Sequence, residues 1–192
     1  VAMTRALQPD PFRLIPDPAL FEGRSTDDLE RKDAAIQNLS REDRLAICHA
    51  QNERIVGKDK VISGTSASSD GHSISAEASS NGFSGIQEST WLWMGSEVSV
   101  NDGGDRKPEG WMWGGAANQA DVPSPEAVAD LALQRAYDQL GSIKGPTTKT
   151  VMVVNPSSTA RLIGRLLSSA SGSSLNQGRS FWKDRKGKAV IS

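Results

Sequence analysis

The chain has 192 residues, with 22 basic and 23 acidic side chains and a formal net charge of −1. This length suffices for one domain or two small lobes around a core, and the balanced charge argues against a broad nucleic-acid interface, which usually needs a basic excess. One cysteine and no apolar run of roughly 20 residues exclude an internal disulfide and predict no membrane helix, so we expect a cytoplasmic protein.

Residues 1–24 are rich in proline, and an Asp-Pro pair occurs twice in them. A residue that precedes proline avoids the α region, so we expect an extended arm here. The capping-box patterns Ser25–Asp28 and Ser40–Asp43 then predict a helix pair within 25–56, with helices near 26–37 and 41–54. The apolar residues expected on the inner side of the second helix are Leu45, Ala46, Ile47, Cys48, Ala50 and Ile55.

Residues 60–117 contain recurrent turn signals between stretches that favour strands. Asp70-Gly71 and Asn81-Gly82 are typical of tight hairpins, and Asp102–Asp105 predicts a third turn. We therefore expect an antiparallel meander of four strands, near 60–69, 72–80, 83–100 and 108–117.

Tryptophans alternate with other residues in two of these strands. The period of two places Trp91 and Trp93 on one face of the sheet. Leu92, Met94, Val98 and Val100 then share the opposite face. Trp111 and Trp113 repeat the pattern on the next strand, so four tryptophans are expected on one face. Two interpretations stay open: the face packs against helices or an absent domain, or it forms a groove that adds an extended peptide to a sheet edge.

Residues 124–170 predict a helix–strand–helix unit. Ser124-Pro125 begins a helix whose inner stripe includes Ala129, Leu133, Ala136 and Leu140, with Ala132 and Tyr137 alongside. Residues 149–154 are apolar and β-branched and predict a buried strand. Asn155 then caps a helix over 156–170, with Leu162, Ile163, Leu166 and Leu167 expected inward. A tail over 171–192 completes a single α+β domain from residue 25 onward, and its basic turn at 183–188 is interpreted as solvated surface.

Candidate catalytic or metal-binding residues are few. His49 and His72 have no second histidine or cysteine at ligand spacing, although a metal site needs three or four converging donors. Cys48 precedes His49, but adjacent residues on a helix point about 100° apart and do not face each other. We therefore expect no catalytic residue, no metal ligand and no cofactor in this chain.

Several motifs, taken in order, resemble the TldD/PmbA family on its PmbA (or TldE) side, from about Asp17 onward. They are Leu20-Phe21 before a helix pair, Asn81-Gly82-Phe83, Asp102–Arg106, Pro125–Val128, Ala136–Gly141 and Val151–Val154. No single motif is unique to the family, and the match depends on their order and spacing. The resemblance implies that an N-terminal lobe and a C-terminal domain would flank this middle region.

The resemblance also implies where chemistry would be located. TldD-type subunits carry a zinc motif, His-Glu-x-x-x-His, after the strand that corresponds to Val151–Val154. On this chain those positions fall at Asn155, Pro156 and Ala160, which supply neither the two histidines nor the glutamate. The family is peptidase-like, includes modulators of DNA gyrase and takes part in maturing microcin-type peptides, with a PmbA-like subunit beside a zinc-bearing TldD-like subunit.

The leading hypothesis is a non-catalytic PmbA-like part of a peptidase complex. Its expected partners are a TldD-like subunit, which would hold the zinc, or a second copy of the chain, together with an unfolded peptide. Nucleic acid and membrane are not expected partners. Trp91, Trp93, Trp111 and Trp113 are the candidate contacts for peptide or partner. The alternatives are a binding scaffold, for example for gyrase, without a peptidase role, and a truncated product without a function of its own.

Overall fold

The computed structural model describes residues 7, 10–12 and 14–189. Ile15–Lys144 form one compact unit, and the described parts of Val1–Leu14 and Gly145–Ser192 form a second. The proline-rich arm predicted over residues 1–24 lies partly outside the described residues. In the described part of the chain, no helix is long and apolar enough to cross a membrane.

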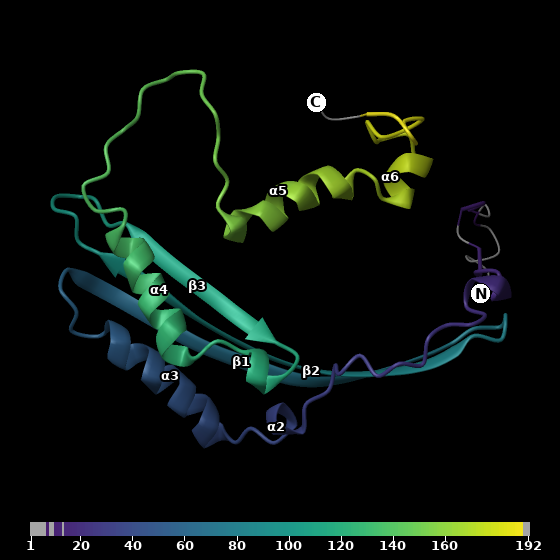
Figure 1. Cartoon of the computed structure of the whole chain (residues 1–192), viewed down its shortest axis with the longest axis horizontal. Coiled ribbons are helices and arrows are strands. Elements are labelled where there is room, and N and C mark those ends of the chain that lie inside the picture. Colours follow the sequence, from purple (N-terminus) through teal and green to yellow (C-terminus); the bar gives the residue numbers. More distant parts are fainter. Residues whose placement is uncertain (1–6, 8–9, 13, 190–192) are drawn as a thin grey trace. The chain divides into compact units, whose positions relative to one another are not determined.

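The first unit is built on a three-stranded antiparallel sheet in the order β1-β2-β3 (Figure 1). The strands are β1 (Val61–Ala78), β2 (Ser84–Val100) and β3 (Glu109–Ala116). The Asn81-Gly82 turn is confirmed: Gly82 has a φ of 89°, and the Asn81 side chain accepts a hydrogen bond from the Phe83 amide at 3.2 Å. The α+β meander with packed helices is therefore confirmed.

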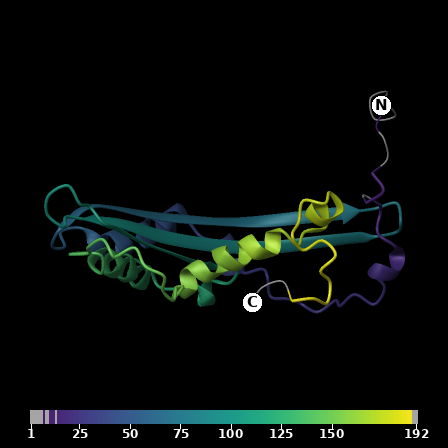
Figure 2. The same ribbon diagram turned by 90° about the horizontal axis from the view of Figure 1, so that it is seen from above.

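The prediction of four strands is wrong, because Asp70-Gly71 does not form a turn. Both residues lie inside β1, where Asp70 pairs with Leu92 and Gly71 pairs with Trp91 on β2. Unbroken pairing keeps the backbone groups that β1 and β2 turn toward each other in the ladder, whereas a turn would leave the facing part of β2 unpaired. As a result β1 and β2 continue past the end of β3 as a long hairpin (Figure 2).

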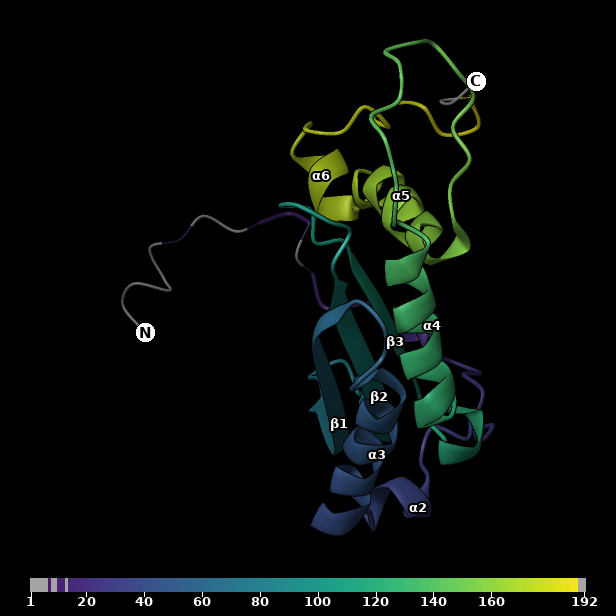
Figure 3. The ribbon, with the colours of Figure 1, turned by 90° about the vertical axis from the view of Figure 1, so that its left-hand side faces the viewer.

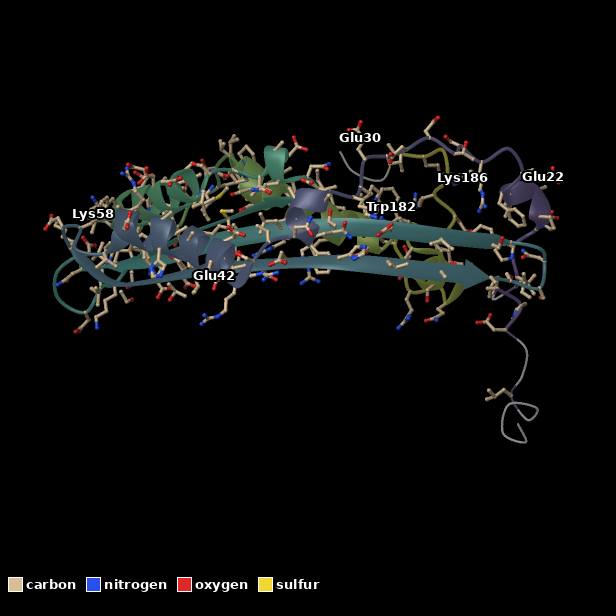
Figure 4. All side chains as sticks on the ribbon, turned by 90° about the horizontal axis from the view of Figure 1, so that it is seen from below. Glu22, Glu30, Glu42, Lys58, Trp182 and Lys186 are labelled. Atoms are coloured by element: carbon tan, nitrogen blue, oxygen red, sulfur yellow. The ribbon has the colours of Figure 1, made fainter. Side chains whose placement is uncertain are left out.

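Lys58 and Glu22 lie near the two ends of the long β1–β2 hairpin (Figure 4). Lys58 lies in the connection that leads into β1. Glu22 follows the short helix η1 (Pro18–Leu20), close to the turn between β1 and β2. There Phe21 and Phe83 form an edge-to-face pair with ring centroids 5.3 Å apart, which anchors the start of the unit on the hairpin.

The helix pair is confirmed only in its second member. Helix α3 (Arg41–Ile55) begins with the expected capping box, in which Ser40 and Asp43 exchange hydrogen bonds. The helix predicted over 26–37 is wrong: only α2 (Ala34–Gln37) is helical. The polar segment before it lacks an apolar face, and its backbone instead reaches the sheet, where the Arg31 carbonyl accepts from the Thr90 amide at 2.9 Å.

Helices α3 and α4 (Pro125–Tyr137) cover one face of the sheet (Figure 3). The predicted alternation in β2 is confirmed, because Leu92, Met94, Val98 and Val100 are all buried beneath these helices. The predicted stripe of α4 is confirmed for Ala129, Ala132, Leu133 and Ala136, whereas Leu140 lies beyond the end of the helix. The buried residues of α4 are Val128, Ala129, Ala132, Leu133 and Ala136. In α3 the prediction fails in part: Leu45 and Ala46 are exposed, and Gln51 and Ile55 are the buried residues.

Helix α4 approaches β3 closely because Gly110 has no side chain. A Cβ at this position would lie 2.8 Å from the backbone carbon of Arg135 and would overlap further backbone atoms of α4. A second contact of this kind occurs where Ile55 of α3 lies over Gly64 of β1. These two glycines allow both helices to lie directly on the sheet.

The second unit contains α5 (Pro156–Ser168) and α6 (Gly172–Asn176). The Asn155 cap of α5 is confirmed, but the strand predicted over 149–154 is wrong. A strand needs a neighbouring strand, and none in the described residues pairs with this segment, so Val151 and Val153 are exposed. Leu162, Ile163 and Leu167, which were expected to point inward, are exposed as well.

A short helix, η2 (Gln119–Asp121), precedes α4 in the first unit.

The close approach at Gly110 gives a first prediction. Gly110→Ala should lower the free energy of unfolding by about 1–3 kcal/mol, because α4 would have to move off the sheet. Urea unfolding followed by far-UV circular dichroism measures this change. Gly145→Ala is the control, since a Cβ there meets no atom within 4 Å; equal stability of the two variants would contradict the packing described.

A second prediction concerns the ion pair between α3 and the middle of β1. Arg44 donates two hydrogen bonds to the Asp70 carboxylate, at 2.5 and 2.7 Å, and these bonds lower the pKa of Asp70. Because the folded pKa lies below the unfolded value of about 3.9, the pair stabilises the fold above that pH. Its contribution is lost as pH falls through the folded pKa.

The unfolding midpoint in urea should therefore fall between about pH 5 and about pH 3. Asp70→Asn should reduce stability at neutral pH and flatten this pH dependence. Asp105→Asn, at an exposed turn position, is the comparison variant. A pH profile that Asp70→Asn leaves as steep as in the wild type would contradict this role.

Candidate functional site

The three positions at which the family resemblance places the zinc motif lie at the start of α5. Asn155 is its N-cap, and its side-chain oxygen accepts from the Ser157 amide at 2.9 Å and the Ser157 hydroxyl at 2.7 Å. Pro156 and Ala160 carry no side-chain donor atom. Zinc requires imidazole, thiolate or carboxylate ligands, so the residues at these positions do not fit the ion.

The remaining metal-binding residue types are dispersed. In residues 7, 10–12 and 14–189, no three His, Cys, Asp or Glu side chains gather as a metal site would require. His49 is exposed on α3 beside the half-buried Cys48. The absence of a metal in the functional protein stays a prediction.

His72 lies within β1 and not after a turn, which corrects its predicted setting. Its Nε2 is 2.6 Å from Glu88 Oε1, and Lys32 Nζ contacts the same oxygen at 2.7 Å. Lys32 and, after it, His72 lower the pKa of Glu88 through these hydrogen bonds. The cluster ties the segment before α2 to the hairpin and has the character of a structural ion pair.

The four tryptophans predicted to share a face do so, on the side of the sheet opposite α3 and α4. We call Trp91, Trp93, Trp111 and Trp113 the Trp platform. Their exposed fractions are 37%, 47%, 46% and 47%, and no helix or strand of Ile15–Lys144 covers them. Their proposed contact with a peptide or partner remains a prediction.

Each of three platform rings lies over a glycine of the neighbouring strand. The directly paired residues are Trp91 with Gly71, Trp113 with Gly95, and Trp93 with Gly115. A Cβ at these glycines would lie 2.7 Å from Trp91 Cε2, 2.6 Å from Trp113 Cε2 and 2.6 Å from Trp93 Cδ2. Because several atoms of each ring surround the position of the missing Cβ, the ring covers the glycine with one face and turns the other outward.

Charged groups around the platform are mainly carboxylates. Glu97 pairs directly with Trp111, and Glu109 lies at the start of the same strand; both are exposed. Arg135 of α4 reaches the rim, where its guanidinium carbon is 5.9 Å from the centre of the Trp111 ring. The chain thus already places one cation on an indole of the edge strand β3.

The glycine partners were the part of the site that the residue pattern alone did not reveal. Glycine inside a strand often marks a close approach of another group, so their presence was the available signal. Their pairing with tryptophan required the register between strands. The buried hydrogen bond from Gln51 Nε2 to Ser96 Oγ, 3.1 Å long, was likewise not expected, since Gln51 belongs to a helix predicted to bury only apolar residues.

The paired glycines give a third prediction. Gly95→Ala should push the Trp113 ring off the sheet, lower the free energy of unfolding by about 1–2 kcal/mol and change the near-UV circular dichroism of the tryptophans. Ser69→Ala, on the same face and directly opposite Trp93, is the matched control. An unchanged aromatic spectrum in Gly95→Ala would show that the ring does not depend on this glycine.

This architecture is similar to that of known proteins. Residues 35–140 match the family model described as PmbA/TldA metallopeptidase central domain. A crystallised candidate modulator of DNA gyrase from Bacteroides thetaiotaomicron VPI-5482 has a similar structure, with a TM-score of 0.90 and 29% identity. The match covers 100% of this chain and 44% of that one.

A second crystallised candidate modulator of a DNA gyrase, from Thermotoga maritima MSB8, shares the fold over 65% of this chain and 28% of its own, with a TM-score of 0.58 and 15% identity. No curated protein matches the sequence significantly. The chain therefore spans less than half the length of either solved structure. Because the central-domain model matches more than half of the residues, from 35 to 140, the chain belongs to the PmbA/TldD family.

Proposed function

We propose that the chain is a non-catalytic, PmbA-like part of a peptidase complex, in which a zinc-bearing TldD-like partner performs hydrolysis. The observation that carries this proposal is the start of α5, where the positions of the zinc motif hold Asn155, Pro156 and Ala160. The only side-chain oxygen among them is occupied as the helix cap. In this proposal a second subunit supplies the ion, because the chain offers no ligands at this place.

The sheet supports the non-catalytic half of this role. The Trp platform is an aromatic face without a covering element in its own unit, and such faces are typical of binding surfaces. In this proposal the chain holds an unfolded peptide while the partner cleaves it. A second copy of the chain is the other partner that this arrangement allows.

A fourth prediction tests this function by metal analysis and kinetics. The purified chain should hold far less than one equivalent of zinc and should not cleave unfolded peptides. Added to a zinc-bearing TldD-like subunit, it should raise kcat/KM for an unfolded peptide by about tenfold, which corresponds to about 1.4 kcal/mol of additional transition-state binding.

Asn155→Ala is the matched variant for the metal measurement, because it removes the only side-chain oxygen at the three positions. Wild type and variant should have the same low zinc content. Stoichiometric zinc that is lost in Asn155→Ala, or chelator-sensitive cleavage by the chain alone, would refute the proposal.

A second candidate function is a binding scaffold without a peptidase role. It is favoured by the similarity to two proteins described as candidate modulators of DNA gyrase. Purified gyrase with and without the chain, compared in a supercoiling assay, separates the two. A change in supercoiling together with no effect on the TldD-like subunit would favour the scaffold.

A further inference from the structure

The near-neutral charge of the whole chain conceals two oppositely charged parts. Residues 15–144, which form the first unit, contain 12 basic and 21 acidic side chains, a formal net charge of −9. Residues 145–192 contain eight basic and one acidic side chain, a net charge of +7. The Trp platform therefore belongs to a strongly acidic unit.

The face that carries the platform has the same sign of charge. In the register of the sheet, the ionisable side chains that the three strands place on this face are Glu77, Glu97 and Glu109. Arg135 of α4 contacts the rim of the platform at Trp111. Arg24 reaches the other end of the hairpin, near Glu77, where it donates a hydrogen bond to the Ser84 carbonyl. Carboxylates beside indole faces create a surface that attracts cations.

We propose that the Trp platform binds the lysine or arginine side chains of an extended polypeptide. The negative face of each indole ring attracts a cationic side chain, and Arg135 on Trp111 is an example within the chain itself. Glu97 lies next to Trp111 and Trp113 in the sheet and supplies the opposite charge. Charge complementarity thus selects a basic segment as the occupant.

The spacing of the rings also suits an extended chain. Trp91 and Trp93 are two residues apart on β2, as are Trp111 and Trp113 on β3, and alternate residues of a strand are about 7 Å apart. Alternate side chains of an extended peptide have the same repeat. A segment with a basic residue at every second position would therefore place its cations on successive rings.

The same charges disfavour the other ligands that stack on aromatic platforms. Single-stranded nucleic acids bind such platforms with the help of a basic groove, whereas this unit carries a net charge of −9. A neutral sugar can donate hydroxyl hydrogen bonds to the carboxylates, but it gains no charge attraction from an acidic surface. The basic polypeptide is the occupant that uses both the rings and the charge.

The inference rests on the proposed function in assuming that the partner cleaves the bound peptide. The binding of the peptide to the platform can be tested without that assumption. A fluorescein-labelled peptide of about ten residues, with alternating arginine and serine, is titrated with the full chain at low salt and followed by fluorescence anisotropy. The arginine peptide should bind, and added salt should lower its affinity. The matched peptide of alternating glutamate and serine should not bind.

Variants assign the binding to the platform. Trp93→Leu should weaken binding of the arginine peptide by about 2- to 30-fold, the range for loss of one cation–π contact. Glu97→Gln should weaken it by about twofold and reduce the salt dependence, since exposed charges contribute modestly. Phe181→Leu, an exposed aromatic residue outside the platform, is the control and should have no effect. Circular dichroism checks that each variant is folded, and Glu97→Gln alone suffices if Trp93→Leu unfolds.

The inference is overturned if the glutamate peptide binds as well as the arginine peptide, or if folded Trp93→Leu and Glu97→Gln bind like the wild type. It is also overturned if an oligosaccharide or a single-stranded oligonucleotide binds the platform and the arginine peptide does not. Binding of the arginine peptide without any gain in kcat/KM of a TldD-like subunit refutes the proposed function and supports this inference. If the chain raises kcat/KM but Trp93→Leu and Glu97→Gln bind the arginine peptide like the wild type, the proposed function is supported and this inference is refuted.

Discussion

The register of β2 between its two neighbours is the constraint on which the rest of the first unit depends. A shift by one residue would expose Leu92, Met94 and Val98 and would turn the tryptophans toward the helices. The glycine partners oppose such a shift sterically. Trp91, Trp93 and Trp113 can lie on the sheet only where the residue paired with each of them on one neighbouring strand is a glycine. The apolar face and the aromatic face therefore specify the same register independently.

Patterns that act over a few residues were sufficient for much of this fold. The alternation of β2, the stripe of α4 and the caps at Ser40, Ser124 and Asn155 could be recognised because their partners are close in sequence. The failures share one cause, namely dependence on a distant segment. Asp70-Gly71 has the composition of a turn, but its partners on β2 are about twenty residues away. The apolar stretch 149–154 has strand propensity, yet no described strand pairs with it.

The candidate site also has one feature that residue type reveals and one that depends on distant segments. The lack of zinc ligands at Asn155, Pro156 and Ala160 is a property of residue type, and it can be recognised once the family resemblance indicates where the motif would lie. The structure of α5 shows in addition that the Asn155 side chain accepts two hydrogen bonds from Ser157. The platform is different, because four tryptophans on alternating positions reveal a shared face but not the orientation of the rings. That orientation follows from glycines on other strands, which only the sheet pairing identifies.

The partial exposure of the platform follows from its role in the sheet. A ring that covers a glycine uses one face for the backbone, so the other face stays in solvent unless a partner covers it. Steric fixing of the register alone would not require acidic neighbours, since an aromatic ring shields a glycine equally well beside neutral or basic residues. The carboxylates of Glu97 and Glu109 beside the rings are thus a separate feature of this face, and the unit as a whole has a net charge of −9 over residues 15–144. Packing explains the position of the rings, and the surrounding charge determines which ligands their outer faces attract.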